Sequence, residues 1–66
     1  MRIKIDKEND SLYLSLDEKS VAVSEEVKPG VILDFDDEGN VIGFELLGLS
    51  TRVHADTLKR LEFETT

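Results

Sequence analysis

An acidic segment in the middle of the chain has the residue types and nearly the spacing of a calcium-binding loop. Asp34, Asp36 and Glu38 alternate, Gly39 follows, and Glu45 stands where such a loop carries its bidentate glutamate. Only Glu38 departs from the pattern, which has Asp or Asn at that position. A loop of this kind lies between two helices, whereas both flanks here alternate as strands.

We therefore interpret the segment as a β-hairpin whose loop is Asp37 to Asn40. In the strand pairing derived below, Asp36 and Glu45 lie roughly 13 Å apart, which is too far for them to hold one ion. A weak surface site for a divalent cation, formed by Asp36, Asp37 and Glu38, is the alternative.

Catalytic combinations are sparse. Asp34 and Asp36 project from the same face of one strand, but an acid and base pair needs two different environments, which an exposed strand near a hairpin tip does not supply. The only histidine, His54, has Ser50, Thr51 and Asp56 nearby in sequence, but no glycine-framed serine elbow is present. We expect no enzymatic activity, no catalytic residues and no cofactor.

Charge is concentrated in the same region. Residues 25 to 45 carry seven acids and one base, so they contribute −6 of the net charge of −7. This surface repels phosphate backbones and attracts basic partners, so we expect no direct binding to nucleic acid. The residues expected to bind a partner are Glu25, Glu26, Asp34, Asp36 and Glu45, together with Tyr13, an exposed aromatic on a polar strand face.

The elements that position these residues follow from alternation of polar and apolar side chains. The pattern predicts strands over residues 2–6, 11–16, 21–28, 31–36 and 41–47 of one domain, 1–66. Glu25 interrupts the apolar side of the third strand, which suggests an edge or a bend. Pro29 and Gly30 fit the two central positions of a type II turn. We expect a mainly β, α+β fold: an antiparallel five-stranded meander with one short C-terminal helix.

A four-residue hairpin loop, with Gly39 left-handed, pairs Phe35 with Ile42, Leu33 with Phe44 and Val31 with Leu46. This register is favoured because it makes one face wholly apolar, and a slip of one residue would exchange the two faces of a strand. It also places Glu45 opposite Ile32.

Beyond Leu46 the pattern predicts a turn over residues 48–52 and a short helix over about 56–62, capped by Asp56, which presents Leu58 and Leu61 to the sheet. Five strands span about 24 Å, whereas one helix covers about 10 Å. We therefore expect a homodimer that covers the remaining apolar surface. The alternative is a sheet that curls into a half barrel around the helix.

The chain has no cysteine, no run of apolar residues long enough to span a membrane and no basic start followed by an apolar run. We expect a soluble, cytoplasmic protein without disulfide bonds and without a membrane partner.

Three ordered stretches resemble a family of small prokaryotic proteins, domain of unknown function 2283. They are residues 5–14, residues 23–34 and residues 37–46 with the following Leu49-Ser-Thr-Arg52. The resemblance spans residues 1 to about 53. It implies a small, mainly β domain with no assigned activity and no catalytic residues to carry over, and it implies that some relatives are partners of small toxins.

Three functional hypotheses remain. The leading one is a non-enzymatic protein–protein interaction module, in which the acidic surface docks a basic protein as an antitoxin-like inhibitor would. The second is a divalent-cation-binding domain that uses the acidic hairpin loop, and the third is a structural module with no independent activity.

Overall fold

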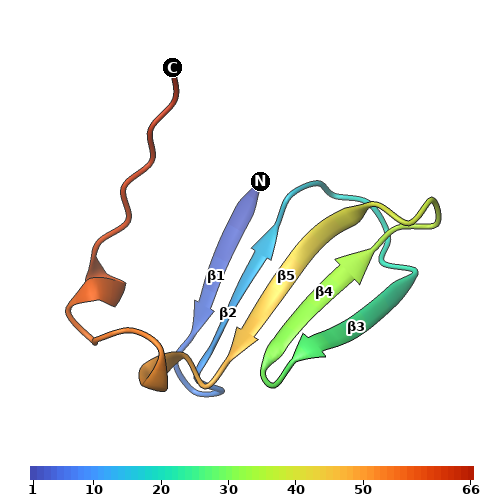
Figure 1. Ribbon diagram of the computed structural model, residues 1–66. Coiled ribbons are helices and arrows are strands. Elements are labelled where there is room, and N and C mark those ends of the chain that lie inside the picture. The colour runs from blue at the N-terminus through green and yellow to red at the C-terminus, as the bar shows by residue number, and fades with distance from the viewer.

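Five antiparallel strands form a single sheet in the computed structural model, which describes residues 1–66. The strands are β1 (Arg2–Asp6), β2 (Ser11–Ser15), β3 (Val23–Lys28), β4 (Val31–Phe35) and β5 (Val41–Leu47). Figure 1 shows them side by side in the order β1-β2-β5-β4-β3. The mainly β, antiparallel, five-stranded prediction is confirmed.

The predicted meander order is wrong, because β5 lies between β2 and β4 and not at an edge. The composition of the strands explains this order. β5 is the longest strand and contains two of the six buried residues, Ile42 and Gly43, so it gains most from a central position, whereas every residue of β3 is exposed. Glu25 was expected to mark an edge or a bend, and the position of β3 confirms the edge.

The register divides the sheet into two faces that we name by their residues. The apolar face carries two rows across the strands, Ile3-Leu14-Phe44-Leu33 and Ile5-Leu12-Leu46-Val31. The polar face carries the rows Lys4-Tyr13-Glu45-Ile32-Glu26 and Arg2-Ser15-Gly43-Asp34-Ser24. Glu25, opposite Leu33, ends the first apolar row.

The hairpin of β4 and β5 agrees with the predicted register except at its tip. Leu33 pairs with Phe44, Val31 with Leu46 and Ile32 with Glu45, as predicted. Phe35 pairs with Val41 instead of Ile42, because the register shifts between Asp34 and Phe35. A bulge of this kind leaves one residue unpaired, and here it leaves Ile42.

Two glycines adopt the left-handed conformations that their predicted turns require. Gly30 has φ +76°, as the third residue of a type II turn needs, and Gly39 in the hairpin loop has φ +84°. These turns join β3 to β4 and β4 to β5.

After β5 the chain forms two short 3-10 turns, η1 (Leu49–Thr51) and η2 (Thr57–Lys59), and no α-helix. The predicted helix over residues 56–62, packed on the apolar face, is therefore not confirmed. Two helical turns are marginal without packing, and the Asp56 side chain makes no capping hydrogen bond. Leu61 is 75% exposed, so it supplies no such packing.

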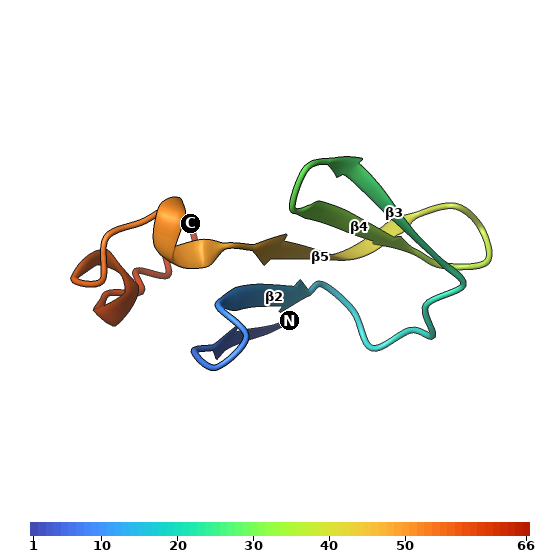
Figure 2. The ribbon, with the colours of Figure 1, turned by 90° about the horizontal axis from the view of Figure 1, so that it is seen from below.

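The sheet has almost no core of its own. Only six of 66 residues are buried, and just two of them, Ile42 and Leu49, are large apolar residues. Figure 2 shows a strongly twisted single layer. No helix in the structure has the length and apolar character to cross a membrane.

Candidate functional site

A cluster on the polar face brings side chains from three strands, β2, β3 and β4, together around Gly43 of β5. A Cβ atom at Gly43 would lie 3.2 Å from the Tyr13 hydroxyl and 3.4 Å from Asp34 Oδ2, so both oxygens crowd over the glycine. The Ser24 hydroxyl donates to Asp34 Oδ1 at 2.7 Å. Asp34 is only 7% exposed, so this carboxylate is a structural acceptor within the sheet.

Tyr13 is shaped by the same cluster. Burial raises the pKa of Tyr13 above its ordinary value of 10.0, and the hydrogen bond and negative charge of Asp34 raise it further. The phenol therefore stays neutral beside the carboxylate. Tyr13 lies on the polar face between Lys4 and Glu45, and it is half-buried.

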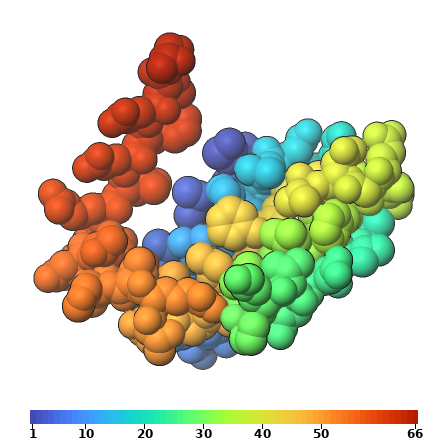
Figure 3. All heavy atoms as spheres, viewed as in Figure 1, coloured from blue at the N-terminus to red at the C-terminus, as the bar shows by residue number.

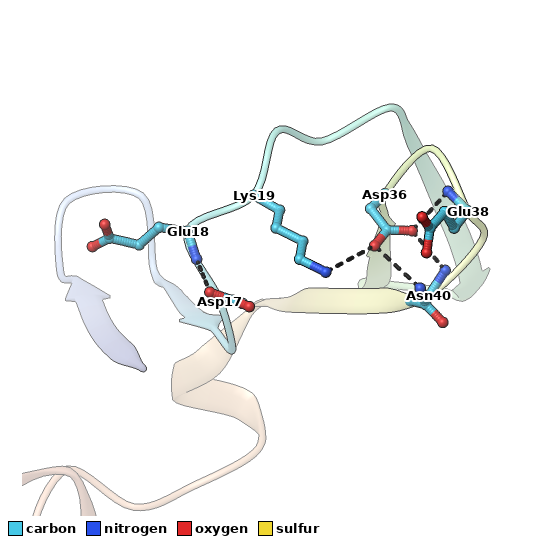
Figure 4. A network of polar contacts seen from close by, with 6 residues as sticks. All are labelled: Asp17, Glu18, Lys19, Asp36, Glu38 and Asn40. Atoms are coloured by element: carbon cyan, nitrogen blue, oxygen red, sulfur yellow. Dashed lines mark hydrogen bonds and ion pairs between the residues drawn. The ribbon is translucent and has the colours of Figure 1, made fainter.

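Asp36 organises the loop between β4 and β5. The backbone N–H groups of Glu38 and Asn40 both donate to Asp36 Oδ1 at 2.9 Å, and Asn40 Nδ2 donates to Oδ2 at 3.2 Å. Lys19 Nζ lies 3.8 Å from Oδ2. Figure 4 shows this ion pair beside the hydrogen bonds of the loop. The hydrogen bond from the Asn40 backbone N–H holds the pKa of Asp36 below its ordinary value. Further lowering comes from the Asn40 side chain, the Glu38 N–H and the positive charge of Lys19.

The three candidate cation ligands do not converge. Asp36 uses both carboxylate oxygens within its own loop, whereas Asp37 and Glu38 are exposed. A shallow depression beside them is also lined by Lys19, whose ammonium competes with a bound cation. No group of three or more His, Cys, Asp or Glu side chains is placed to hold a metal ion.

The predicted partner-binding acids also divide into two groups. Asp34 and Asp36 are buried and hydrogen-bonded, so they are held within the fold. Glu26 and Glu45 lie in one row of the polar face, on either side of Ile32, while Glu25 points to the apolar side. The acids that stay available to a partner are therefore those of β3 and Glu45.

Asp10 and Arg52 do structural work that the sequence patterns did not show. Asp10 has φ 51°, and its carboxylate accepts bonds from the Ser50 backbone N–H at 2.9 Å and from the Ser50 hydroxyl at 2.7 Å. Arg52 donates to the carbonyls of Leu47 at 2.9 Å and Pro29 at 3.0 Å. These contacts fasten η1 to two turns at one end of the sheet.

Crowding at Gly30 shows how closely Arg52 lies over the turn between β3 and β4. A Cβ atom at Gly30 would lie 2.7 Å from Arg52 Nη2. Three short patterns are thus brought together, namely the turn at Asp10, the Pro29-Gly30 turn and the residues Leu49 to Arg52. Their co-occurrence in order was visible in the sequence, but their contact was not.

The apolar face is the largest uncovered feature. Ile3 is 42% exposed and Ile5 38%, and the central residues Leu14, Leu33 and Phe44 are only half-buried by their neighbours in the sheet. Figure 2 shows a single layer of strands with no helix or second sheet over either face. A contiguous apolar surface of this size is uncommon on proteins that remain monomeric in water.

Comparison with known families decides the relationship. The sequence model of a family described as protein of unknown function (DUF2283) matches residues 2–50 of the 66. The chain belongs to this family. The DUF2283 match covers all five strands, together with Asp10, Gly30, Gly43 and Ser50, and it ends before Arg52.

The resemblance expected from the three sequence stretches is thus confirmed. No curated protein and no solved structure matches the chain. The residues after Ser50, which include both η2 and the C-terminal segment, lie outside the DUF2283 match.

Proposed function

We propose that this DUF2283 chain is a non-enzymatic, cytoplasmic protein–protein interaction module that pairs with a second copy of itself through the apolar face. The open apolar face carries this proposal. A chain with two large apolar residues in its core gains most of its stability by burying these rows against another surface.

A second copy fits the face in size. Five strands about 4.8 Å apart and five to seven residues long cover a projected area of about 500 Å². Two such faces together bury about 1,000 Å², which reaches the range of specific interfaces, since side-chain relief adds area to the projection. Stacked sheets pack about 10 Å apart, so the rows interdigitate as the layers of a sandwich do.

A second copy also fits the face in chemistry. Both rows are aliphatic and aromatic from β1 to β4, and the two charged residues aligned with them, Glu25 opposite Leu33 and Lys28 opposite Val31, both lie on the edge strand β3. In a twofold interface each copy presents the same rows, so an apolar surface meets an apolar surface and Glu25 stays at the rim.

Neighbouring residues of β4 give a matched test. Leu33 and Ile32 are both aliphatic and half-buried, but Leu33 lies on the apolar face and Ile32 on the polar face. We expect the wild-type chain to sediment at twice the mass of a 7.4 kDa monomer at micromolar concentration. Leu33→Asp should raise the dissociation constant at least about 100-fold, because each copy would bury an unpaired carboxylate.

Ile32→Asp should leave the dissociation constant within about threefold of wild type, provided that both variants keep a folded circular dichroism spectrum. A wild-type chain that is folded and monomeric at 100 µM, or an equal effect of the two substitutions, would contradict the proposal.

The acidic residues of β3 favour a second candidate function, binding of a basic protein in the manner of an antitoxin-like inhibitor. Glu25 and Glu26 are exposed on an edge strand, and the net charge of −7 adds a long-range attraction. Asp34 and Asp36 contribute to the field but not to direct contact.

Charge reversal tests this second function. We expect a chain with Glu25→Lys and Glu26→Lys to bind an immobilised basic peptide at least about 10-fold more weakly than wild type in 50 mM salt, with the difference shrinking in 500 mM salt. Glu8→Lys/Glu18→Lys, which changes the net charge by the same amount outside β3, serves as the control for nonspecific effects of charge. Equal binding by wild type and by the reversed chain would exclude a site on β3.

A further inference from the structure

The two edge strands of the sheet differ in how well they are protected against further pairing. β3 carries Glu25 and Glu26, shifts register between Glu26 and Lys28, and is followed by Pro29. Charges, bulges and proline are the usual means of blocking an edge. β1 has neither a bulge nor a proline, because its five residues pair with β2 in unbroken register, and its charged residues, Arg2, Lys4 and Asp6, all lie on the polar face. Its outer side is therefore a regular, open edge.

The C-terminal segment, which we define as residues 60–65, has the sequence of a strand and no partner. Arg60 is extended, with φ −122° and ψ 118°, and Leu61 and Phe63 alternate with Glu62 and Glu64. No residue after Arg60 takes part in a backbone hydrogen bond. Leu61 is 75% exposed and Phe63 77%, and Figure 3 shows the segment standing clear of the sheet.

The segment and β1 are complementary in one antiparallel register. If Leu61 lies opposite Ile5, then Phe63 lies opposite Ile3, and both pairs extend the rows of the apolar face. The remaining pairs, on the polar face, are of opposite charge: Arg60 with Asp6, Glu62 with Lys4 and Glu64 with Arg2. A slip of one residue would set apolar side chains against charges throughout, so this register is strongly preferred.

We propose that residues 60–65 add to the outer edge of β1 as a sixth antiparallel strand of their own sheet. The chain path supports a strand from the same molecule. Asp10 holds η1 at the end of the β1–β2 hairpin, and the segment then runs past the β1 edge in the direction opposite to β1 (Figure 1). The eight residues 52–59 span up to about 28 Å, enough to deliver Arg60 to Asp6.

A sixth strand has two consequences for the fold. It pairs the open N–H and C=O groups of β1, which removes an unprotected edge. It also widens the apolar face by one strand, with Leu61 and Phe63 placed beside Ile5 and Ile3. This strand does not depend on the proposed dimer, since a monomer forms it equally well.

Paired cysteines test the register directly, because the natural chain has none. Two in-register variants are needed, Lys4→Cys/Glu62→Cys and Ile5→Cys/Leu61→Cys, since adjacent antiparallel pairs alternate between wide and narrow spacing. The control is Lys4→Cys/Phe63→Cys, whose side chains would lie on opposite faces. At low micromolar concentration, one in-register pair should form an intramolecular disulfide at least about 10-fold faster than the control.

Two results would overturn this assignment. Equal rates for the in-register and control pairs would exclude the strand, and disulfide-linked dimers that require the in-register pair would assign it to a second copy.

Hydrogen exchange in the unmodified chain gives an independent check. Backbone amides of residues 61–64 should exchange at least about 10-fold more slowly than in a Phe63→Asp variant. Exchange at the same rate in both chains would contradict the proposal.

Discussion

On the polar face of the sheet, side chains from different strands come together in one cluster, whereas the apolar rows on the other side have no partner outside the sheet. Tyr13 and Asp34 meet over Gly43, and Ser24 donates to Asp34. Ile3 and Ile5, on the opposite side, remain more than a third exposed.

This difference indicates that the two faces have separate roles. Contacts across the polar face are specific to one strand order, since they require β2, β5, β4 and β3 to lie side by side in that spatial order. Apolar rows are less selective, because hydrophobic burial is nondirectional. The polar face thus defines the fold of one chain, and the apolar face is the surface that we propose for association with another.

Gly43 offers the strongest way to break the polar face. A Cβ atom there would lie 3.0 Å from the Leu14 carbonyl oxygen, which belongs to the backbone of β2 and cannot swing away. We expect Gly43→Val to lower the free energy of unfolding by about 1–3 kcal/mol through overpacking, a large part of the total for a chain of this size. Urea unfolding monitored by circular dichroism measures the loss.

Gly43→Ala provides a graded comparison with the valine variant. It adds only the crowded Cβ and recovers some backbone entropy, so its cost should be smaller than that of valine. If both variants unfold at the wild-type urea concentration, the close packing of Tyr13 and Leu14 over Gly43 does not stabilise the sheet.

Local patterns predicted the parts of the fold that local chemistry determines. Alternation gave the pairing of Leu33 with Phe44, and turn chemistry gave the positive φ angles of Gly30 and Gly39. Each of these depends on residues within one hairpin. Glu25 likewise marked β3 as an edge strand, because a charge among apolar positions is tolerated there.

Contacts between distant residues were not predictable in the same way. Predicting that β5 lies between β2 and β4 requires a comparison of strand pairings between residues far apart in sequence. Alternation of polar and apolar residues cannot make this comparison, because it is the same for any order of the strands. Arg52 reaches Pro29 across 23 residues, and Ser50 reaches Asp10 across 40. Spacing alone likewise did not reveal that both carboxylate oxygens of Asp36 accept hydrogen bonds within its own loop.

The dependence of folding stability on pH is a smaller effect, and it reports on Asp36, Asp6 and Tyr13 rather than on the apolar face. The pKa of Asp36 is lowered in the folded chain, so below about pH 3.8 the unfolded chain binds a proton that the folded chain still excludes, and stability falls as pH falls. Hydrogen bonds from Asn9 lower the pKa of Asp6, so Asp6 adds to the same loss of stability at acid pH. The pKa of Tyr13 is raised, so above pH 10.0 the folded chain keeps a proton that the unfolded chain loses, and stability falls as pH rises.

Urea titrations of single variants at each pH separate the acid and alkaline effects. Asp36→Asn should reduce the loss of stability at acid pH, with the remaining loss due to Asp6. Tyr13→Phe should reduce the loss of stability at alkaline pH. Tyr13 is the only tyrosine, so its ionisation can be followed by ultraviolet absorbance, with a midpoint above 10.0 in the folded chain. A midpoint at or below 10.0 would show that the phenol is not held beside Asp34.

Leu33→Asp, which acts on the apolar face, should leave that midpoint in place, because the Tyr13 environment is built entirely on the polar side of the sheet.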